Sequence, residues 1–288
     1  MSTRRPPPGT VRIAALRGIF RTVGSVAPGV AARWAEDIFC RPPRQEARAV
    51  EERYLETGSP FTVRFEGDEL RAWSWGSGPL VILAHGWGSR AGRWAALAPM
   101  LVERGFRVVT YDAPAHGRSP GRRASLPEFS RALEAVAGAT GPVHGLVGHS
   151  LGAAAIALAL GAGLPAERAV LLASPADPEV FADRFAATLA ISDAVRATMQ
   201  RNLETRLQMN WKSLHLPTVV AGLRTPALVI HDRDDPDISP ADAEAIAAAW
   251  PGARLMLTNG LGHRAIIRAP AVLGAAAAFL SDPAPPAR

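Results

Sequence analysis

The feature that most constrains the fold of this chain is a short glycine-flanked motif, Gly148-His149-Ser150-Leu151-Gly152. The motif follows an apolar run that ends at Val147, and it precedes an alanine-rich stretch over residues 153–160 that is typical of a helix. The order is therefore strand, sharp turn, helix. At such a turn the central serine adopts a strained backbone and neighbouring segments approach closely, so the flanking positions must lack side chains.

Ser150 is consequently a candidate nucleophile. Leu151 begins the predicted helix, where unpaired backbone N–H groups and the helix dipole favour negative charge, so its N–H is a candidate oxyanion donor. A glycine-serine turn alone is also common in ordinary loops, and the flanking pattern favours the functional interpretation. A serine hydroxyl is unreactive at neutral pH unless a histidine takes its proton and a carboxylate orients that histidine. Both residue types are expected downstream.

Both occur after later predicted strands. The apolar run over residues 226–231 leads into a loop that is rich in carboxylates, namely Asp232, Asp234, Asp235 and Asp237. Ser239 and Pro240 then provide the start signal of a helix. A further strand over residues 253–257 precedes a glycine-bearing loop with His263. The chain order is serine, carboxylate, histidine.

With these residues in place, the chain resembles the α/β-hydrolase family. Residues 79–88, which include His85, Gly86 and Trp87, resemble the third strand and oxyanion loop of that family. Residues 108–119 resemble its fourth strand and the following turn, with Ala115 where glycine is commoner. The resemblance covers roughly residues 61–280 except for the segment 176–223, and several motifs in the correct order make it specific.

The resemblance implies a catalytic triad and an oxyanion hole. Ser150 is the implied nucleophile, His263 the base and Asp235 the acid, and the backbone N–H groups of Trp87 and Leu151 are the implied oxyanion donors. Asp232 stands where the family usually has glycine. This departure leaves Asp232 and Asp237 open as less favoured choices for the acid. The remaining polar residues of the motifs, His85, His116 and Asp112, are interpreted as structural braces of their loops, and His149 and His231 as ordinary satisfied side chains.

The implied fold class is α/β, with a mostly parallel doubly wound sheet. We predict an N-terminal extension over residues 1–60, a hydrolase core over 61–175 and 224–282, and a helical cap over 176–223. The core is expected to begin with a hairpin, because apolar residues alternate on both sides of Gly67. The chain of 288 residues, 48% hydrophobic, is long enough for a single large core.

Two segments outside the motifs have helical periodicity. The extension opens with a proline-rich tail predicted to be disordered, and then places Ile13, Leu16 and Phe20 at helical spacing. The helices of the extension are expected to pack on the hydrolase body in preference to anchoring on a membrane surface, since Arg12 falls near the apolar side of the first helix. The cap has two apolar stripes, Phe181, Phe185 and Leu189, and Val195, Met199, Leu203 and Leu207. In this family such a cap covers the nucleophile, which implies an apolar acyl pocket.

Composition excludes several other classes. The net charge of +6 comes from dispersed arginines, with no basic-aromatic module, so we expect no nucleic-acid partner. No phosphate loop, dinucleotide fingerprint or zinc spacing is present, and the aspartate loop lacks the calcium pattern because Pro236 and Asp237 occupy its fifth and sixth positions. No cofactor and no metal are expected. The single Cys40 is compatible with a cytoplasmic location, with membrane-surface contact disfavoured.

The sequence therefore predicts a serine hydrolase that cleaves a carboxylic ester, thioester or amide of a small-molecule substrate. Two alternatives stay open: an acyltransferase with the same triad, and a non-catalytic binding module on the same fold. The oligomeric state is not constrained by the sequence.

Overall fold

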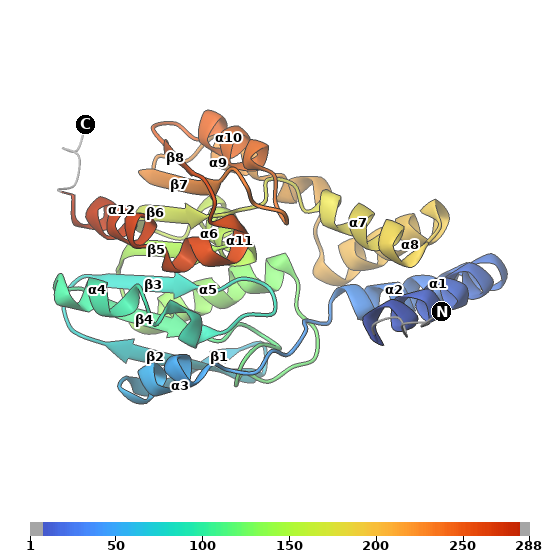
Figure 1. Ribbon diagram of the computed structural model, residues 1–288, viewed down its shortest axis with the longest axis horizontal. Helices are drawn as coiled ribbons and strands as arrows, with labels where there is room; N and C mark the ends of the chain where they lie inside the picture. Colours follow the sequence, from blue (N-terminus) through green and yellow to red (C-terminus); the bar gives the residue numbers. More distant parts are fainter. Residues whose placement is uncertain (1–7, 283–288) are drawn as a thin grey trace, which may run out of the picture. The chain divides into compact units, whose positions relative to one another are not determined.

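The computed structural model describes residues 8–282 of the chain (Figure 1). Within that range the chain forms two compact units. The helical unit comprises residues 8–41 together with Asp177–Leu214, and the sheet unit comprises Pro42–Ala176 together with residues 215–282. The predicted disordered tail, with Arg4 and Arg5, lies outside the described residues.

Within the described residues, the sheet unit contains one eight-stranded sheet in the order β1-β2-β4-β3-β5-β6-β7-β8. The first two strands form the predicted antiparallel hairpin, and β2 is antiparallel to β4, whereas all later pairs are parallel. Parallel strands are covered on both faces and so read as continuous apolar runs. The strands are β1 (Ser59–Phe65), β2 (Asp68–Trp75), β3 (Leu80–Ala84), β4 (Arg107–Tyr111), β5 (Val143–His149), β6 (Ala166–Leu172), β7 (Ala227–Asp232) and β8 (Arg254–Thr258).

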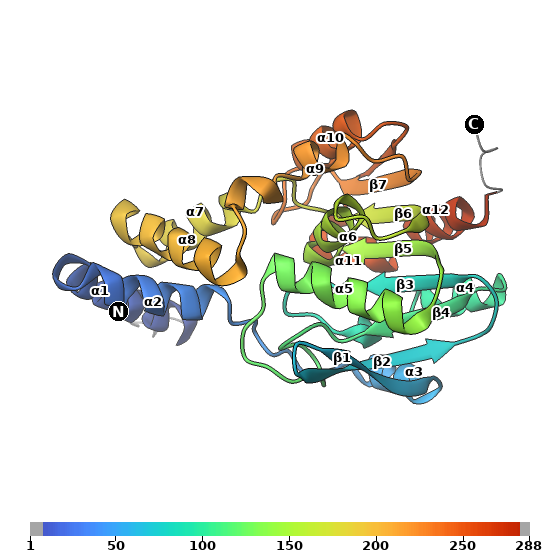
Figure 2. The same cartoon turned by 180° about the vertical axis from the view of Figure 1, so that it is seen from behind.

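Helices cover both faces of this sheet (Figures 1 and 2). On one face of the sheet, side chains of α4 and α12 pack in a core with strand residues such as Val81, Val108 and Val170. On the opposite face, α5 packs against α6. The helices are α3 (Ala49–Glu56), α4 (Ala98–Glu103), α5 (Leu126–Thr140), α6 (Leu151–Gly161), α9 (Leu216–Val220), α10 (Pro240–Ala249), α11 (Gly262–Ala265) and α12 (Pro270–Ser281), with short 3-10 turns η1 (Ala91–Trp94) and η3 (Ile266–Arg268). This architecture confirms the predicted α/β fold class.

The helical unit joins segments that are distant in the sequence. It contains α1 (Pro8–Val26), α2 (Pro28–Phe39), α7 (Glu179–Leu189), α8 (Asp193–Leu207) and the 3-10 turn η2 (Trp211–Leu214). α1 contacts α7 and α2 contacts α8, while the rings of Phe39 and Phe185 lie 5.2 Å apart. The Arg206 guanidinium reaches the Glu36 carboxylate at 3.0 Å. The N-terminal helices and the inserted helices, which the sequence analysis treated separately, are therefore partners in one core.

This partnership changes the interpretation of the two apolar stripes. Leu189, Met199 and Leu203 are all buried, and a Cβ added at Gly24 of α1 would lie 3.5 Å from Val195 of α8. Much of the apolar surface that the sequence offered for a substrate pocket thus packs inside the helical unit itself. The first segment of the helical unit ends at Arg41, and α3 belongs to the sheet unit. The boundary between the N-terminal helices and the sheet unit therefore lies at residue 41 and not at residue 60, where the sequence analysis put the end of the extension.

No single helix among residues 8–282 is both long and apolar enough to cross a membrane. One bent pair, residues 262–268 with Pro270–Ser281, meets the length and composition requirement. Its second helix, α12, places Val272 and Phe279 in the buried core of the sheet unit.

The glycine after the serine turn provides a test of this packing. A Cβ at Gly152 would lie 2.4 Å from the carbonyl oxygens of both Ala84 and His85, so Gly152→Ala is expected to lower the free energy of unfolding by about 1–3 kcal/mol. Gly274→Ala in α12 is the matched control, because nothing lies within 4 Å of its added Cβ and alanine favours helix by up to about 1 kcal/mol. Urea unfolding of the two variants should separate them. Equal stabilities would contradict the close approach.

Candidate active site

Ser150 sits at the sharp turn between β5 and α6. Its backbone has φ 54° and ψ −122°, a left-handed conformation that costs on the order of 1–3 kcal/mol for a residue with a side chain. The N–H of Ser150 donates to the carbonyl oxygen of Leu172 at 2.9 Å, which holds the turn against the neighbouring strand. A Cβ at Gly148 would lie 2.6 Å from the backbone of Ala153. The two glycines of the motif are therefore required by contact on both sides.

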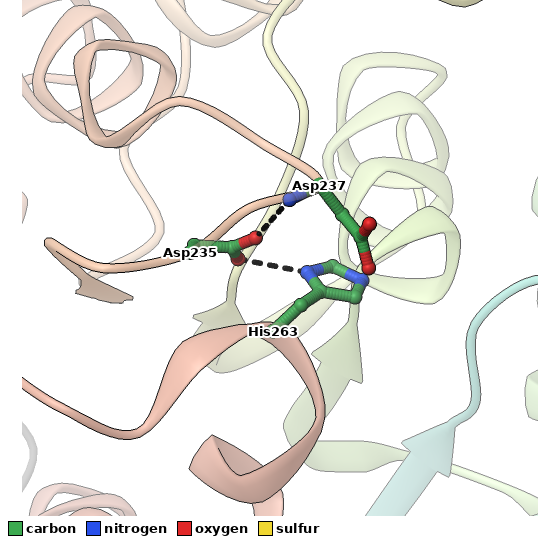
Figure 3. A group of neighbouring side chains, drawn as sticks. All are labelled: Asp235, Asp237 and His263. Carbon is green, nitrogen blue, oxygen red and sulfur yellow. Dashed lines mark hydrogen bonds and ion pairs between the residues drawn. The ribbon is translucent and has the colours of Figure 1, made fainter.

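His263 and Asp235 are brought together from the loops after β8 and β7. The Nδ1 of His263 donates to Oδ2 of Asp235 at 2.8 Å (Figure 3). With its proton on Nδ1, the imidazole keeps Nε2 free to accept a proton from a hydroxyl. The other oxygen of Asp235 accepts from the N–H groups of Asp237 at 2.8 Å and Ile238 at 3.0 Å. The carboxylate is thus fixed in orientation before any substrate binds.

The charge on Asp235 is maintained by its hydrogen bonds. Burial of its side chain opposes ionisation, but hydrogen bonds from His231, His263 and the N–H of Ile238 outweigh burial and hold the pKa of Asp235 below its ordinary value. The acid is therefore an anion throughout the neutral range, as an imidazole-orienting carboxylate must be.

His231 contacts the same carboxylate, which the sequence analysis missed. This fully buried residue of β7 places Nε2 at 3.4 Å from Oδ2 of Asp235 and 3.1 Å from the carbonyl oxygen of Ile238. Both neighbours are acceptors, so Nε2 carries the proton. Its Nδ1 is buried without a hydrogen-bond partner among the described residues. The interpretation of His231 as an ordinary satisfied side chain is therefore wrong.

Of the two less favoured choices for the acid, Asp232 contacts the loop of His263 and Asp237 lies beside the His263 ring. Asp232 is buried and accepts hydrogen bonds from the N–H of Gly262 at 2.9 Å and the hydroxyl of Thr258 at 2.7 Å. Burial opposes its ionisation, but these hydrogen bonds outweigh burial and lower the pKa of Asp232. Asp232 thus braces the loop that carries His263.

The carboxylate of Asp237 lies beside the imidazole of His263, on the side away from Asp235 (Figure 3). Ligand atoms of Asp235, Asp237 and His263 all lie within 4.8 Å of one another, the one grouping of metal-ligating residue types found in the described part of the chain. A cation there would compete with the imidazole proton for Asp235, because His263 and Asp235 already share a hydrogen bond.

His149, next to the candidate nucleophile, supports the candidate base. Its Nε2 donates to the carbonyl oxygen of His263 at 2.8 Å, and the two rings lie 4.8 Å apart. Burial, followed by the nearby His263, lowers the pKa of His149 to about 3, so the ring is neutral. The loop of His263 is consequently held through its backbone by both His149 and Asp232.

The candidate oxyanion loop, residues 85–88, is held by the histidines that the sequence analysis assigned to structural roles. His85 donates through Nδ1 to the carbonyl oxygen of Gly86 and accepts from the N–H of Ala113 at 3.0 Å. His116 accepts from the N–H of Gly88 at 2.9 Å. Burial lowers the pKa of His85 to about 3 and of His116 to about 4, which keeps both rings neutral and able to accept.

Asp112 braces the following turn in the same way, since it accepts from the N–H groups of Ala91 and Arg118. On the other side of the loop, a Cβ at Gly86 would lie 3.0 Å from the Cβ of Ser150. The oxyanion loop therefore closely approaches the candidate nucleophile, as the predicted donor role of Trp87 requires.

A cavity of about 160 Å³ lies in the sheet unit beside the candidate nucleophile and the candidate base. Its walls include three predicted site residues, Ser150, His263 and Trp87. Asp235 stands behind His263, and Leu151 is the first residue of α6, where its N–H lacks an intrahelical acceptor. Sequence reasoning did not identify the polar residues that complete the wall, Gln45, Ser89, Arg93 and Arg264. Ser89 and Arg264 adjoin predicted motifs in the sequence but belong to no residue pattern of their own, and Gln45 and Arg93 lie outside the motifs.

Comparisons with known proteins show to which family the chain belongs. Residues 81–207 match the family model described as "Alpha/beta hydrolase family", and residues 208–288 match the model described as "TAP-like protein". A pimeloyl-[acyl-carrier protein] methyl ester esterase from Aromatoleum aromaticum is 30% identical over 241 residues, which cover 67% of this chain and 94% of that protein. The chain belongs to the α/β-hydrolase family. It is an enzyme of the hydrolase type, as the sequence predicted.

Other relatives match over shorter stretches of this hydrolase. The pimeloyl-[acyl-carrier protein] methyl ester esterase of Methylococcus capsulatus is 47% identical over 27% of this chain and 30% of that protein. The non-heme haloperoxidase of Rhodococcus erythropolis is 34% identical over 34% of this chain and 37% of that protein. This chain thus spans about a third of the length of these two relatives.

Solved structures share the fold. A hydrolase from Pseudomonas aeruginosa has a TM-score of 0.61 at 23% identity, covering 78% of this chain and 98% of that one. Carboxylesterase CesB from Bacillus subtilis has a TM-score of 0.60 at 18% identity, covering 81% and 96%.

The aspartate loop allows the acid to be tested by substitution. Asp235→Asn should reduce kcat for p-nitrophenyl butyrate by roughly 10³–10⁴-fold, because the imidazole loses its orienting charge. Asp237→Asn should stay within about tenfold, since Asp235 remains in place. Asp232→Asn should act mainly through stability, as a lower melting temperature. A loss in folded Asp237→Asn as large as that in Asp235→Asn would show that the acid is misassigned.

The lowered pKa of Asp235 also predicts a pH-dependent stability difference. Because the folded pKa lies below the ordinary value of 3.8, the ionised carboxylate stabilises the fold above about pH 4, and this contribution is lost as the pH falls toward the folded pKa. The gap in unfolding free energy between wild type and Asp235→Asn should therefore be larger at pH 6 than at pH 3. Urea titrations at both values check this, and a gap that widens in acid would contradict a stabilising role of the ionised carboxylate.

Proposed function

We propose that this hydrolase cleaves a carboxylic ester of a small molecule through an acyl-enzyme on Ser150. His263 takes the hydroxyl proton through Nε2 as Ser150 attacks the ester carbonyl, and it then returns the proton to the leaving alcohol. Asp235 orients the imidazole and stabilises its positive charge. Water, activated by His263, hydrolyses the acyl-enzyme in the second half of the reaction.

The hydrogen bond between His263 and Asp235, beside the cavity that holds Ser150, supports this proposal most directly. In this mechanism the N–H groups of Trp87 and Leu151 bind the oxyanion of the tetrahedral intermediate. Such a donor is typically worth a factor of about 10²–10³ in rate. The strained serine turn and the braced oxyanion loop hold nucleophile and donors in place before the substrate arrives.

The names of the relatives favour esters among the acyl compounds. Besides the methyl ester esterases, a monoacylglycerol lipase of Mycolicibacterium smegmatis is 36% identical over 34% of this chain and 38% of that protein. Hydrolysis of thioesters or amides would use the same triad, as would transfer of the acyl group to an alcohol or thiol. Product analysis with competing acceptors distinguishes hydrolysis from acyl transfer. We also propose a cytoplasmic location, on the single Cys40.

The nucleophile can be identified directly. A fluorophosphonate probe should form one adduct that maps by mass spectrometry to Ser150, and Ser150→Ala should abolish both labelling and ester turnover while circular dichroism shows an unchanged fold. His263→Ala should label far more slowly than wild type, because the serine loses its base. An adduct on a different serine, or no adduct in folded wild type, would refute the assignment.

A further inference from the structure

Two arginines line the cavity beside Ser150. Arg264 immediately follows His263 on α11; it is solvent-exposed and pairs with no carboxylate among residues 8–282. Arg93 lies on η1, directly after the oxyanion loop, with a side chain only 20% exposed. The guanidinium of Arg93 is held by Glu51 at 3.3 Å, Ser89 at 3.4 Å and Gln45 at 3.5 Å. One arginine is thus held by three side chains, and the other is exposed on the cavity wall.

The surrounding charge is predominantly positive. Burial lowers the pKa of Arg93; Glu51 opposes this shift, while Arg48, Arg264 and Arg90 add to it. Glu51 pairs with Arg93, and Glu52 is shared between Arg90 and Arg118. Among the described residues, the guanidinium groups of Arg48 and Arg264 form no ion pair with a carboxylate, although the backbone N–H of Arg48 donates to the Glu51 carboxylate at 3.4 Å. Arg93 also lowers the pKa of His149, so its field reaches the residue next to the nucleophile.

We propose that the substrate carries a carboxylate, and that Arg93 and Arg264 bind this carboxylate in the cavity beside Ser150. This inference rests on the ester hydrolysis proposed above. Guanidinium groups match the planar geometry of a carboxylate and are weakly hydrated, so they bind this group well in a partly enclosed site. The ester carbonyl would then lie at Ser150, with the anionic end of the same molecule against the arginines.

A singly charged carboxylate fits this wall better than a phosphate dianion. Asp237 is the carboxylate among the lining residues, and it would repel a second negative charge. The cavity of about 160 Å³ is also smaller than the several hundred Å³ typical of sites for drug-sized ligands. The proposal therefore differs from the apolar acyl pocket expected from the sequence, because it predicts a short substrate that carries a carboxylate.

The test compares two methyl esters of equal carbon number, monomethyl adipate and methyl hexanoate, which differ only in a terminal carboxylate. Wild type should show a kcat/KM ratio of about ten or more in favour of monomethyl adipate at pH 8 and low salt, measured by methanol release. Arg264→Gln should lower this ratio about tenfold, and Arg264→Lys should retain most of it. Raising the salt to 0.5 M should also lower the wild-type ratio, because screening weakens the attraction.

Arg233→Gln is the matched control, since Arg233 is exposed and outside the cavity wall, and its ratio should match wild type. Arg93→Gln should also lower the ratio. Because this substitution removes the ion pair with Glu51, the variant could fail to fold, and the Arg264→Gln result then decides the test. A wild-type ratio at or below one, or a ratio that Arg264→Gln leaves unchanged, would overturn the anionic subsite while ester hydrolysis stands. Absence of turnover for both esters, with no fluorophosphonate adduct, would refute the proposed function itself.

Discussion

The close approach of three backbone segments around Ser150 is the constraint on which the rest of the structure depends. The end of β3, the oxyanion loop and the turn between β5 and α6 meet at distances that leave no room for a Cβ at Gly152 and little at Gly86. That proximity brings Ser150 and the loop residues Gly86 and Trp87 to the wall of one cavity. It also explains the strained backbone of Ser150, which persists only because packing on all sides enforces it.

The candidate base is held in place by polar contacts from separate strands. Asp235 fixes the imidazole of His263 through Nδ1, whereas Asp232 and His149 fix the backbone on either side of that ring through Gly262 and the His263 carbonyl. These contacts converge because parallel strands end at the same edge of the sheet. Each partner is buried or nearly so, and hydrogen bonds in such surroundings define one geometry at the expense of others.

The parts of the fold and site that could be predicted from the sequence are those with a local signal. The hairpin has an alternating periodicity, the strand-turn-helix around Ser150 has two flanking glycines, and the loops with Asp235 and His263 resemble motifs of the family. Arg93 and Gln45 line the same cavity as Ser150 only because the chain folds back, and no sequence spacing indicates that. The packing of α1 and α2 against α7 and α8 is likewise set by tertiary contacts. Each of these helices has an apolar stripe, and a stripe alone does not indicate which surface it packs on. His231 reads as one more residue of a buried strand, and its contact with Asp235 depends on the path of the loop.

The central claim, a single acyl-enzyme common to all esters of one acid, is tested most directly by product partitioning. Phenyl butyrate and p-nitrophenyl butyrate are hydrolysed in the presence of hydroxylamine, and the ratio of butyryl hydroxamate to butyrate is measured for each. If both esters acylate Ser150 and differ only in the departed alcohol, the two ratios are identical at any one hydroxylamine concentration. Ratios that differ with the leaving group would show direct attack of water on the ester and would contradict the mechanism.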